Sequence, residues 1–169
     1  MSAIVDKMEV LSYYGRYEGW IAAMSRAAAR KRVKRAHRAM DFKFEAPPVP
    51  PHDSIAVGLR AFFKIKEKWN LSYEEAKTLL GQPGKSTYYN WQRGRVGDAA
   101  HRLDLATRIS YVLGIFKALN IIYEQPDLAD SWVRKPNDAF GGQSALERML
   151  AGQIVDLAQV REYLDSARG

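Results

Sequence analysis

Residues 71–95 read LSYEEAKTLLGQPGKSTYYNWQRGR and predict two short helices joined by a tight turn. The first helix opens with Ser72 and Glu75, a capping box in which each side chain bonds the backbone N–H of the other residue. It stops at Gly81, because glycine readily adopts the left-handed conformation that ends a helix. The connection 82–85 then leads into the second helix. Two short helices around a glycine-containing turn are the arrangement of a DNA-binding helix-turn-helix.

The second helix is expected over residues 87–93, with Ser86 as its N-cap and Gly94 just past its end. Tyr88 and Trp91 are three residues apart and share the face that we assign to the core. The outward side chains are hydrogen-bond donors and cations of the kind that bind bases and phosphates. An ordinary helical hairpin with exposed polar residues remains the alternative. The predicted DNA contacts are Lys85, Ser86, Thr87, Tyr89, Asn90, Arg93 and Arg95.

The remaining apolar residues recur mostly at helical spacing, which predicts an all-α fold. Asp53 or Ser54 should cap a helix that carries core residues as far as Trp69. Residues 103–123 form the longest apolar helix. A second capping box, Ser144-Ala145-Leu146-Glu147, opens a short helix, and Asp156 should begin the last one. No run of alternating β-branched residues stands out, so little or no sheet is expected.

Charge and proline divide the chain into four parts. We expect a basic helical N-terminal extension at 1–46 and a proline-rich linker at 47–52. We expect the helix-turn-helix core at 53–135 and a C-terminal helical module at 136–169. Residues 1–52 hold ten Lys and Arg against five Asp and Glu, whereas the last part holds three against five. The basic front half suits a polyanion such as DNA, although its cations equally fit a solvated helix.

Catalysis has little support in this sequence. The absence of cysteine excludes disulfides, thiolate zinc sites and a cysteine nucleophile. His37, His52 and His101 are far apart and show no metal-ligand spacing, and the chain has neither a phosphate loop nor a nucleophile elbow. We therefore expect a non-enzyme without cofactor or metal. With no signal pattern and no run of about 18–20 apolar residues, the protein is expected in the cytoplasm.

Two stretches resemble a known family. Residues 86–94 are similar to the recognition-helix region of Xre-type helix-turn-helix proteins, with Trp91 and Gly94 at the landmark positions. The C-terminal part resembles, more specifically, the toxin-binding domain of the Xre/MbcA/ParS antitoxins. Family members often have proline where Ala145 stands here. The resemblance covers about residues 54–169, and its C-terminal motif is Trp132, Pro136-Asn137, Phe140-Gly141-Gly142 and Ala145-Leu146-Glu147.

The resemblance implies an antitoxin that partners a toxin with a RES domain, a class that consumes NAD. In such systems the C-terminal segment of the antitoxin covers the toxin's active site. The complex then binds its own operator and represses the operon, and we expect the antitoxin to be a homodimer. A stand-alone transcriptional regulator without a toxin is the alternative.

The final segment is expected to reach the toxin, because it is short and terminal and reverses the charge of the chain. Its apolar stripe of Leu157, Val160 and Leu164 can fill a groove on a partner. Its acidic end suits a pocket built for an anionic nucleotide. The stripe can equally complete this protein's own core. The predicted toxin contacts are Asn137, Phe140, Leu157, Val160, Tyr163, Leu164, Asp165, Arg168 and Gly169.

Overall fold

The computed structural model describes residues 52–97 and 102–168, so the basic extension and most of the proline-rich linker lie outside it. The described part is all-α, as predicted, and its one β-type contact is an isolated bridge between Pro136 and Ser144. The 3-10 helix η1 spans Asp138–Phe140. The α-helices are α2 (His52–Lys68), α3 (Tyr73–Leu79), α4 (Lys85–Gln92), α5 (Arg102–Ile122), α6 (Pro126–Trp132), α7 (Ala145–Met149) and α8 (Ile154–Arg168).

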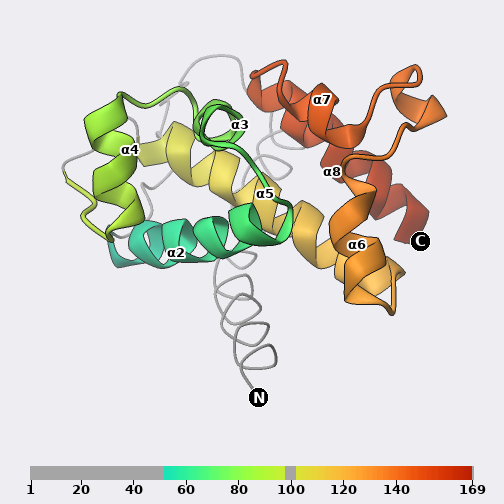
Figure 1. Ribbon diagram of the computed structural model, residues 1–169, viewed down its shortest axis with the longest axis horizontal. Coiled ribbons are helices and arrows are strands. Elements are labelled where there is room, and N and C mark those ends of the chain that lie inside the picture. The colour runs from blue at the N-terminus through green and yellow to red at the C-terminus, as the bar shows by residue number, and fades with distance from the viewer. Residues whose placement is uncertain (1–51, 98–101, 169) are drawn as a thin grey trace, which may run out of the picture.

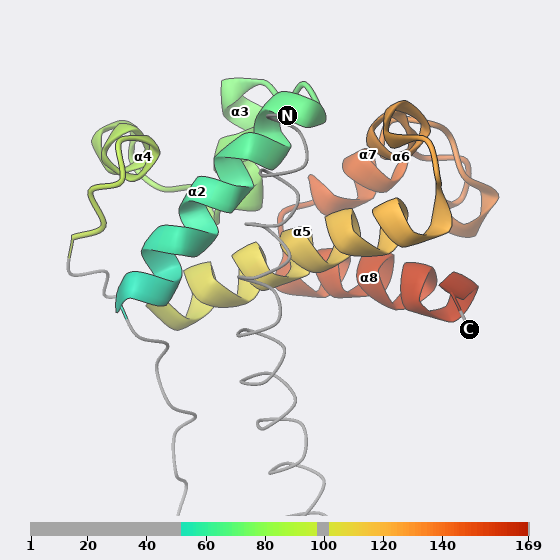
Figure 2. The same ribbon diagram turned by 90° about the horizontal axis from the view of Figure 1, so that it is seen from below.

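The central helix is α5, which α2, α6 and α8 all contact (Figures 1 and 2). Apolar side chains are buried around most of its circumference, the pattern of a helix enclosed by others. The span Leu103–Ile122 is long and apolar enough to cross a membrane, but 67% of the window that meets this test is buried inside the fold. Burial against neighbouring helices therefore accounts for the apolar character of α5.

The helix-turn-helix is formed by α3 and α4. The capping box is present as predicted, with Ser72 N donating to Glu75 Oε2 at 2.7 Å and Glu75 N donating to Ser72 Oγ at 3.2 Å. Gly81 follows α3 with a φ of +85°, and a β-carbon there would lie 3.0 Å from both Arg108 Nε and Asp104 Oδ2. Glycine at this turn therefore serves both the backbone conformation and the close approach of α5.

Three predicted helix starts are wrong. Helix α4 begins at Lys85 after Gly84, which makes no side-chain cap, so Ser86 lies inside the helix instead of capping it. The carbonyl of Gly84 accepts the first helical hydrogen bond, from the backbone N–H of buried Tyr88 at 2.9 Å. Helix α2 already begins at His52, so neither Asp53 nor Ser54 precedes it.

Helix α8 begins at Ile154, two residues before the predicted start. The carboxylate of Asp156 reaches back and accepts a hydrogen bond from Gln153 N at 3.0 Å. Asp156 also pairs with Arg148 on α7 at 2.9 Å. It therefore stabilises the start of α8 from within the first turn, where a carboxylate also favours the helix dipole.

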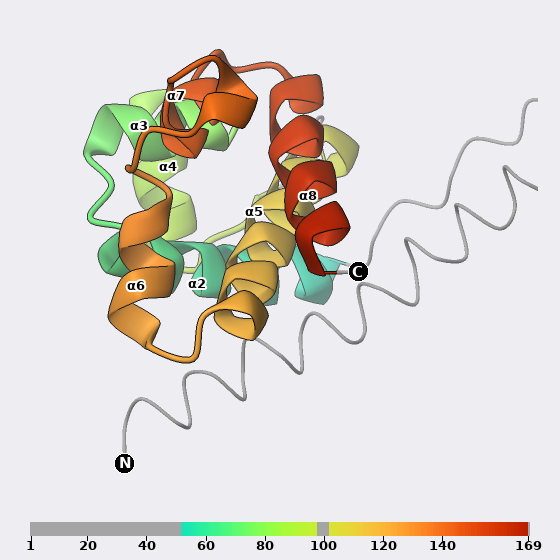
Figure 3. The same cartoon turned by 90° about the vertical axis from the view of Figure 1, so that its right-hand side faces the viewer.

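The C-terminal half folds back onto the core. After α6 the chain passes through η1 and α7, and α8 then lies along α5 with both helices running in the same direction (Figures 2 and 3). Leu157, Val160 and Leu164 are buried in this contact. The last helix is therefore part of the same hydrophobic core as the helix-turn-helix.

Candidate functional site

Helix α4 and the residues just after it carry the predicted DNA contacts, with Arg93 as the C-cap of α4 and Arg95 two residues further along the chain. Of those residues only Asn90 is half-buried, and the others are exposed: Lys85, Ser86, Thr87, Tyr89, Arg93 and Arg95. Tyr88 is 1% exposed and Trp91 packs against the core, as predicted. The helix lies at one end of the long axis of the molecule (Figure 1). An accessible helix with cations and amides on its outer face can enter a DNA major groove.

A cluster of aromatic rings anchors α4 to the rest of the fold. Tyr88 packs edge-on against Phe63 of α2 and Tyr73 of α3, with ring centroids 5.5 and 4.8 Å apart. Burial, and then the neighbouring Tyr89 and Tyr73, raise the pKa of the Tyr88 hydroxyl. The ring therefore stays neutral at physiological pH and behaves as a core residue.

A second aromatic cluster lies at the opposite end of the molecule. Tyr163 of α8 stacks on Trp132 of α6, with centroids 6.2 Å apart and planes inclined by 15°. Phe140 of η1 packs edge-on against the Tyr163 ring, with ring centroids 5.2 Å apart. Tyr163 remains 37% exposed. Partly exposed aromatic rings are enriched where proteins bind one another, so this aromatic cluster is a candidate partner surface.

Trp132 was not among the predicted contacts, although it opens the motif on which the family resemblance rests. Its position next to Tyr163 depends on a contact between residues 31 positions apart, which helical spacing does not reveal. Asn137 has a local role in this cluster, because its Oδ1 accepts a hydrogen bond from Ala139 N at 2.9 Å and caps η1. Gly141, with a φ of +68°, ends η1 just beyond Phe140.

The predicted apolar stripe of α8 requires a correction. Leu157, Val160 and Leu164 are at most 2% exposed, because α5 and its neighbours cover them. These three side chains complete the protein's own core, and they are not available to a partner while α8 stays packed. Asp165 bonds Arg161 one turn earlier, at 2.7 Å. Gly169 and the side chain of Arg168 lie outside the described residues.

Two family models match the chain, one for each end. Residues 52–114 match the antitoxin Xre-like helix-turn-helix domain, and residues 118–169 match the antitoxin Xre/MbcA/ParS C-terminal toxin-binding domain. The chain belongs to the Xre/MbcA/ParS antitoxin family. The antitoxin is also 43% identical over 122 residues to the uncharacterized protein y4oB of Sinorhizobium fredii, across 71% of this chain and 92% of that relative. No solved structure matches it significantly.

Each candidate surface falls in one of the two matched domains. Helix α4 falls in the matched helix-turn-helix domain, and Trp132, Phe140 and Tyr163 fall in the matched toxin-binding domain. The C-terminal description names a toxin-binding domain and the other a helix-turn-helix domain, which fits a regulator that acts by binding DNA and a toxin. The resemblance found in the sequence is therefore confirmed at both ends of the antitoxin.

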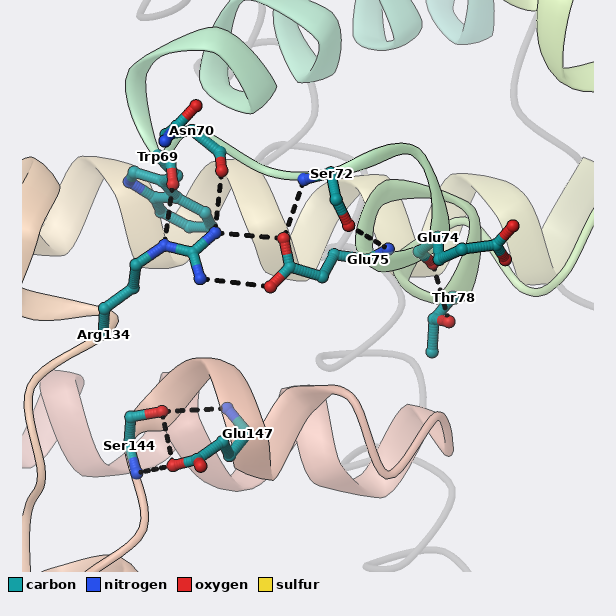
Figure 4. A network of polar contacts seen from close by, with 9 residues as sticks. All are labelled: Trp69, Asn70, Ser72, Glu74, Glu75, Thr78, Arg134, Ser144 and Glu147. Carbon is teal, nitrogen blue, oxygen red and sulfur yellow. Dashed lines mark hydrogen bonds and ion pairs between the residues drawn. The ribbon is translucent and has the colours of Figure 1, made fainter.

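Arg134 joins the two halves of the antitoxin (Figure 4). Its guanidinium forms two hydrogen bonds to the Glu75 carboxylate, at 3.1 and 3.0 Å, and donates to the carbonyl oxygens of Trp69 and Asn70 at 3.2 and 2.8 Å. Asn70 lies two residues beyond the end of α2 and has a φ of +48°, so both carbonyls belong to the turn that follows this helix. A residue of the toxin-binding half thus supports the capping box of α3.

A second arginine makes a similar connection beneath the turn of the helix-turn-helix. Arg108 of α5 is buried, pairs with Asp104 at 2.9 Å and donates to the carbonyl of Gly152 at 3.0 Å. A β-carbon at Gly152 would lie 3.6 Å from the methyl carbon of Thr78, so α3 lies next to the turn between α7 and α8. Polar and packing contacts therefore hold the two matched domains as one unit.

The Arg134–Glu75 pair predicts a specific acid sensitivity. The hydrogen bond from Arg134 is the main cause that lowers the pKa of Glu75 below its usual value. Because the folded-state pKa is depressed, the ionised group stabilises the fold above about pH 4.3 and loses that effect as pH falls through the folded pKa. Glu75→Gln should lower the free energy of unfolding by roughly 0.5–1 kcal/mol at pH 7, a modest value because the pair is partly exposed. Urea unfolding from pH 7 to pH 3 measures this.

Glutamine keeps the capping-box acceptor, so the variant removes the charge together with one of the two hydrogen bonds from Arg134. The difference between wild type and Glu75→Gln should shrink on acidification. Glu74→Gln is the matched control, since Glu74 lies in the same helical turn and pairs with Lys77 instead of Arg134. A difference for Glu75→Gln that stays constant down to pH 3 would show that the charge of Glu75 does not stabilise the antitoxin.

Proposed function

We propose that this antitoxin neutralises a RES-domain, NAD-consuming toxin by covering its active site, and that it binds operator DNA to repress its own operon. One observation carries the proposal: α4 lies at one end of the molecule, and α6 and the end of α8, which carry the partly exposed rings Trp132 and Tyr163, lie at the other (Figures 1 and 2). Toxin and DNA can therefore be bound at the same time. The RES class is supported by the resemblance of the motif from Trp132 to Glu147 to antitoxins with such partners.

The aromatic cluster of Trp132, Phe140 and Tyr163 is the proposed centre of the toxin interface. Partly exposed rings fixed by their neighbours supply contact area at low entropic cost. We further propose that two copies of the antitoxin bind a two-fold symmetric operator, since a helix-turn-helix dimer reads two half-sites. The complex would act in the cytoplasm, where the operator is.

Co-expression tests the toxin partner directly. We expect a RES-domain protein to be encoded beside the antitoxin. That protein should arrest growth alone, lose that effect with the antitoxin, and co-purify with it. A protein that binds the DNA upstream of its gene but neither rescues growth nor co-purifies with the toxin would be a stand-alone transcriptional regulator.

The recognition helix gives a prediction for DNA binding. Asn90→Ala and Arg93→Ala should each weaken specific operator binding by roughly 1–3 kcal/mol, because amide and guanidinium groups of such a helix read base edges. Gel shifts on the upstream DNA measure the effect, and the helical circular dichroism should stay unchanged. Glu162→Ala, an exposed change on α8 far from α4, is the control. Wild-type affinity in both variants would remove α4 and its C-cap from the DNA interface.

A further inference from the structure

Tyr89 is held between two other tyrosines on the exposed side of α4. Its ring stacks on Tyr73 of α3, with centroids 5.8 Å apart and planes inclined by 11°. The edge of Tyr88 approaches it at 5.6 Å and 89°. Tyr89 nevertheless stays 38% exposed. One residue of the outer face of α4 is thus a large ring supported by the helix that precedes it.

This support bears on recognition because a free side chain must be ordered when it binds. A tyrosine has few rotatable bonds, and stacking on a neighbour restricts them further before any ligand arrives. Ordering a side chain beforehand raises the affinity of the complex by removing that entropic cost from binding. Tyr73 is the first residue of α3, directly after Ser72, so the capping box sets its position.

We propose that Tyr73 is a positioning residue for DNA recognition, and that it fixes the Tyr89 ring in the orientation in which Tyr89 contacts the operator. Tyr73 acts through stacking and needs no contact of its own with DNA. The contact is with a base, to which Tyr89 offers an apolar ring edge and a hydroxyl group. This inference rests on the proposed binding of operator DNA by α4.

The experiment compares binding to the upstream DNA with binding to a shuffled duplex of the same length and composition. Tyr73→Leu should weaken upstream-DNA binding about 3- to 10-fold, the effect of losing one aromatic pair, and should leave shuffled-duplex binding unchanged. Selectivity then falls by the same factor. Tyr73→Phe keeps the ring and should stay within about 2-fold of wild type.

A matched control separates positioning from general support of the fold. Phe63 packs on Tyr88, as Tyr73 does, and has no ring contact with Tyr89. Phe63→Leu should therefore lower the melting temperature without changing selectivity. In a Tyr89→Ala background the effect of Tyr73→Leu on selectivity should vanish, because nothing remains to be positioned.

Three results would overturn the inference: wild-type selectivity in Tyr73→Leu, an equal loss in Phe63→Leu, or an undiminished effect of Tyr73→Leu when Tyr89 is already alanine. A wild-type antitoxin that binds both duplexes equally would instead overturn the proposed operator binding, and this inference with it. The wild-type measurement thus distinguishes the two failures.

Discussion

Leu157→Ala is expected to lower the free energy of unfolding by about 2–5 kcal/mol, the usual cost of truncating a fully buried leucine. Leu157 is 0% exposed and lies where α8 packs along α5. The cost combines the lost burial of apolar surface with the cavity that the rigid helices leave behind. Urea unfolding followed by circular dichroism gives the value.

Val155→Ala is the matched control, because Val155 lies on the same helix and is 55% exposed. It should change stability by no more than about 0.5 kcal/mol. Deleting residues 161–169 should behave like Leu157→Ala, since it removes buried Leu164 from the core. Because this deletion destabilises the whole fold, it should impair toxin neutralisation and DNA binding together. Deletion of a tail outside the core would impair toxin neutralisation alone. A cost below about 1 kcal/mol for Leu157→Ala would show that α8 is not packed in solution and is free to reach a partner.

The features that could be predicted from the sequence are mostly local ones. Both capping boxes, Ser72 with Glu75 and Ser144 with Glu147, connect residues three positions apart, and both are present in the structure. The start of α4 was predicted wrongly because it depends on the burial of Tyr88 against α2 and α3, which lies outside the local pattern.

The candidate site shows a second limit. The apolar spacing of Leu157, Val160 and Leu164 indicates a buried face, but spacing is the same whether α5 or a toxin buries it. Arg134 was not predicted, since its partners lie 59 to 65 residues earlier in the chain: the carboxylate of Glu75 and the backbone carbonyls of Trp69 and Asn70. Backbone acceptors have no residue type that a sequence pattern could detect. Long-range contacts of this kind were therefore recognised only in the folded structure.

Tyr163→Ala is expected to weaken the antitoxin–toxin complex by at least about 2 kcal/mol, roughly a 30-fold rise in Kd. The ring is exposed enough to be touched, yet it is fixed on two sides by Trp132 and Phe140. Removing it takes away its own contact area and also frees both neighbours, which then have to be ordered on binding. Calorimetric titration of the purified toxin with each variant measures the change.

The neighbouring residue supplies the control. Glu162 is exposed on the same turn of α8 and makes no ring contact, so Glu162→Ala should change Kd by less than about 5-fold, as expected for a charge at the rim of an interface. Operator gel shifts should be unaffected in both variants, because α4 lies at the other end of the molecule (Figure 1). If Tyr163→Ala bound the toxin like wild type while remaining folded, the aromatic cluster would be structural only. The toxin interface would then have to lie elsewhere on residues 118–169, the matched toxin-binding domain.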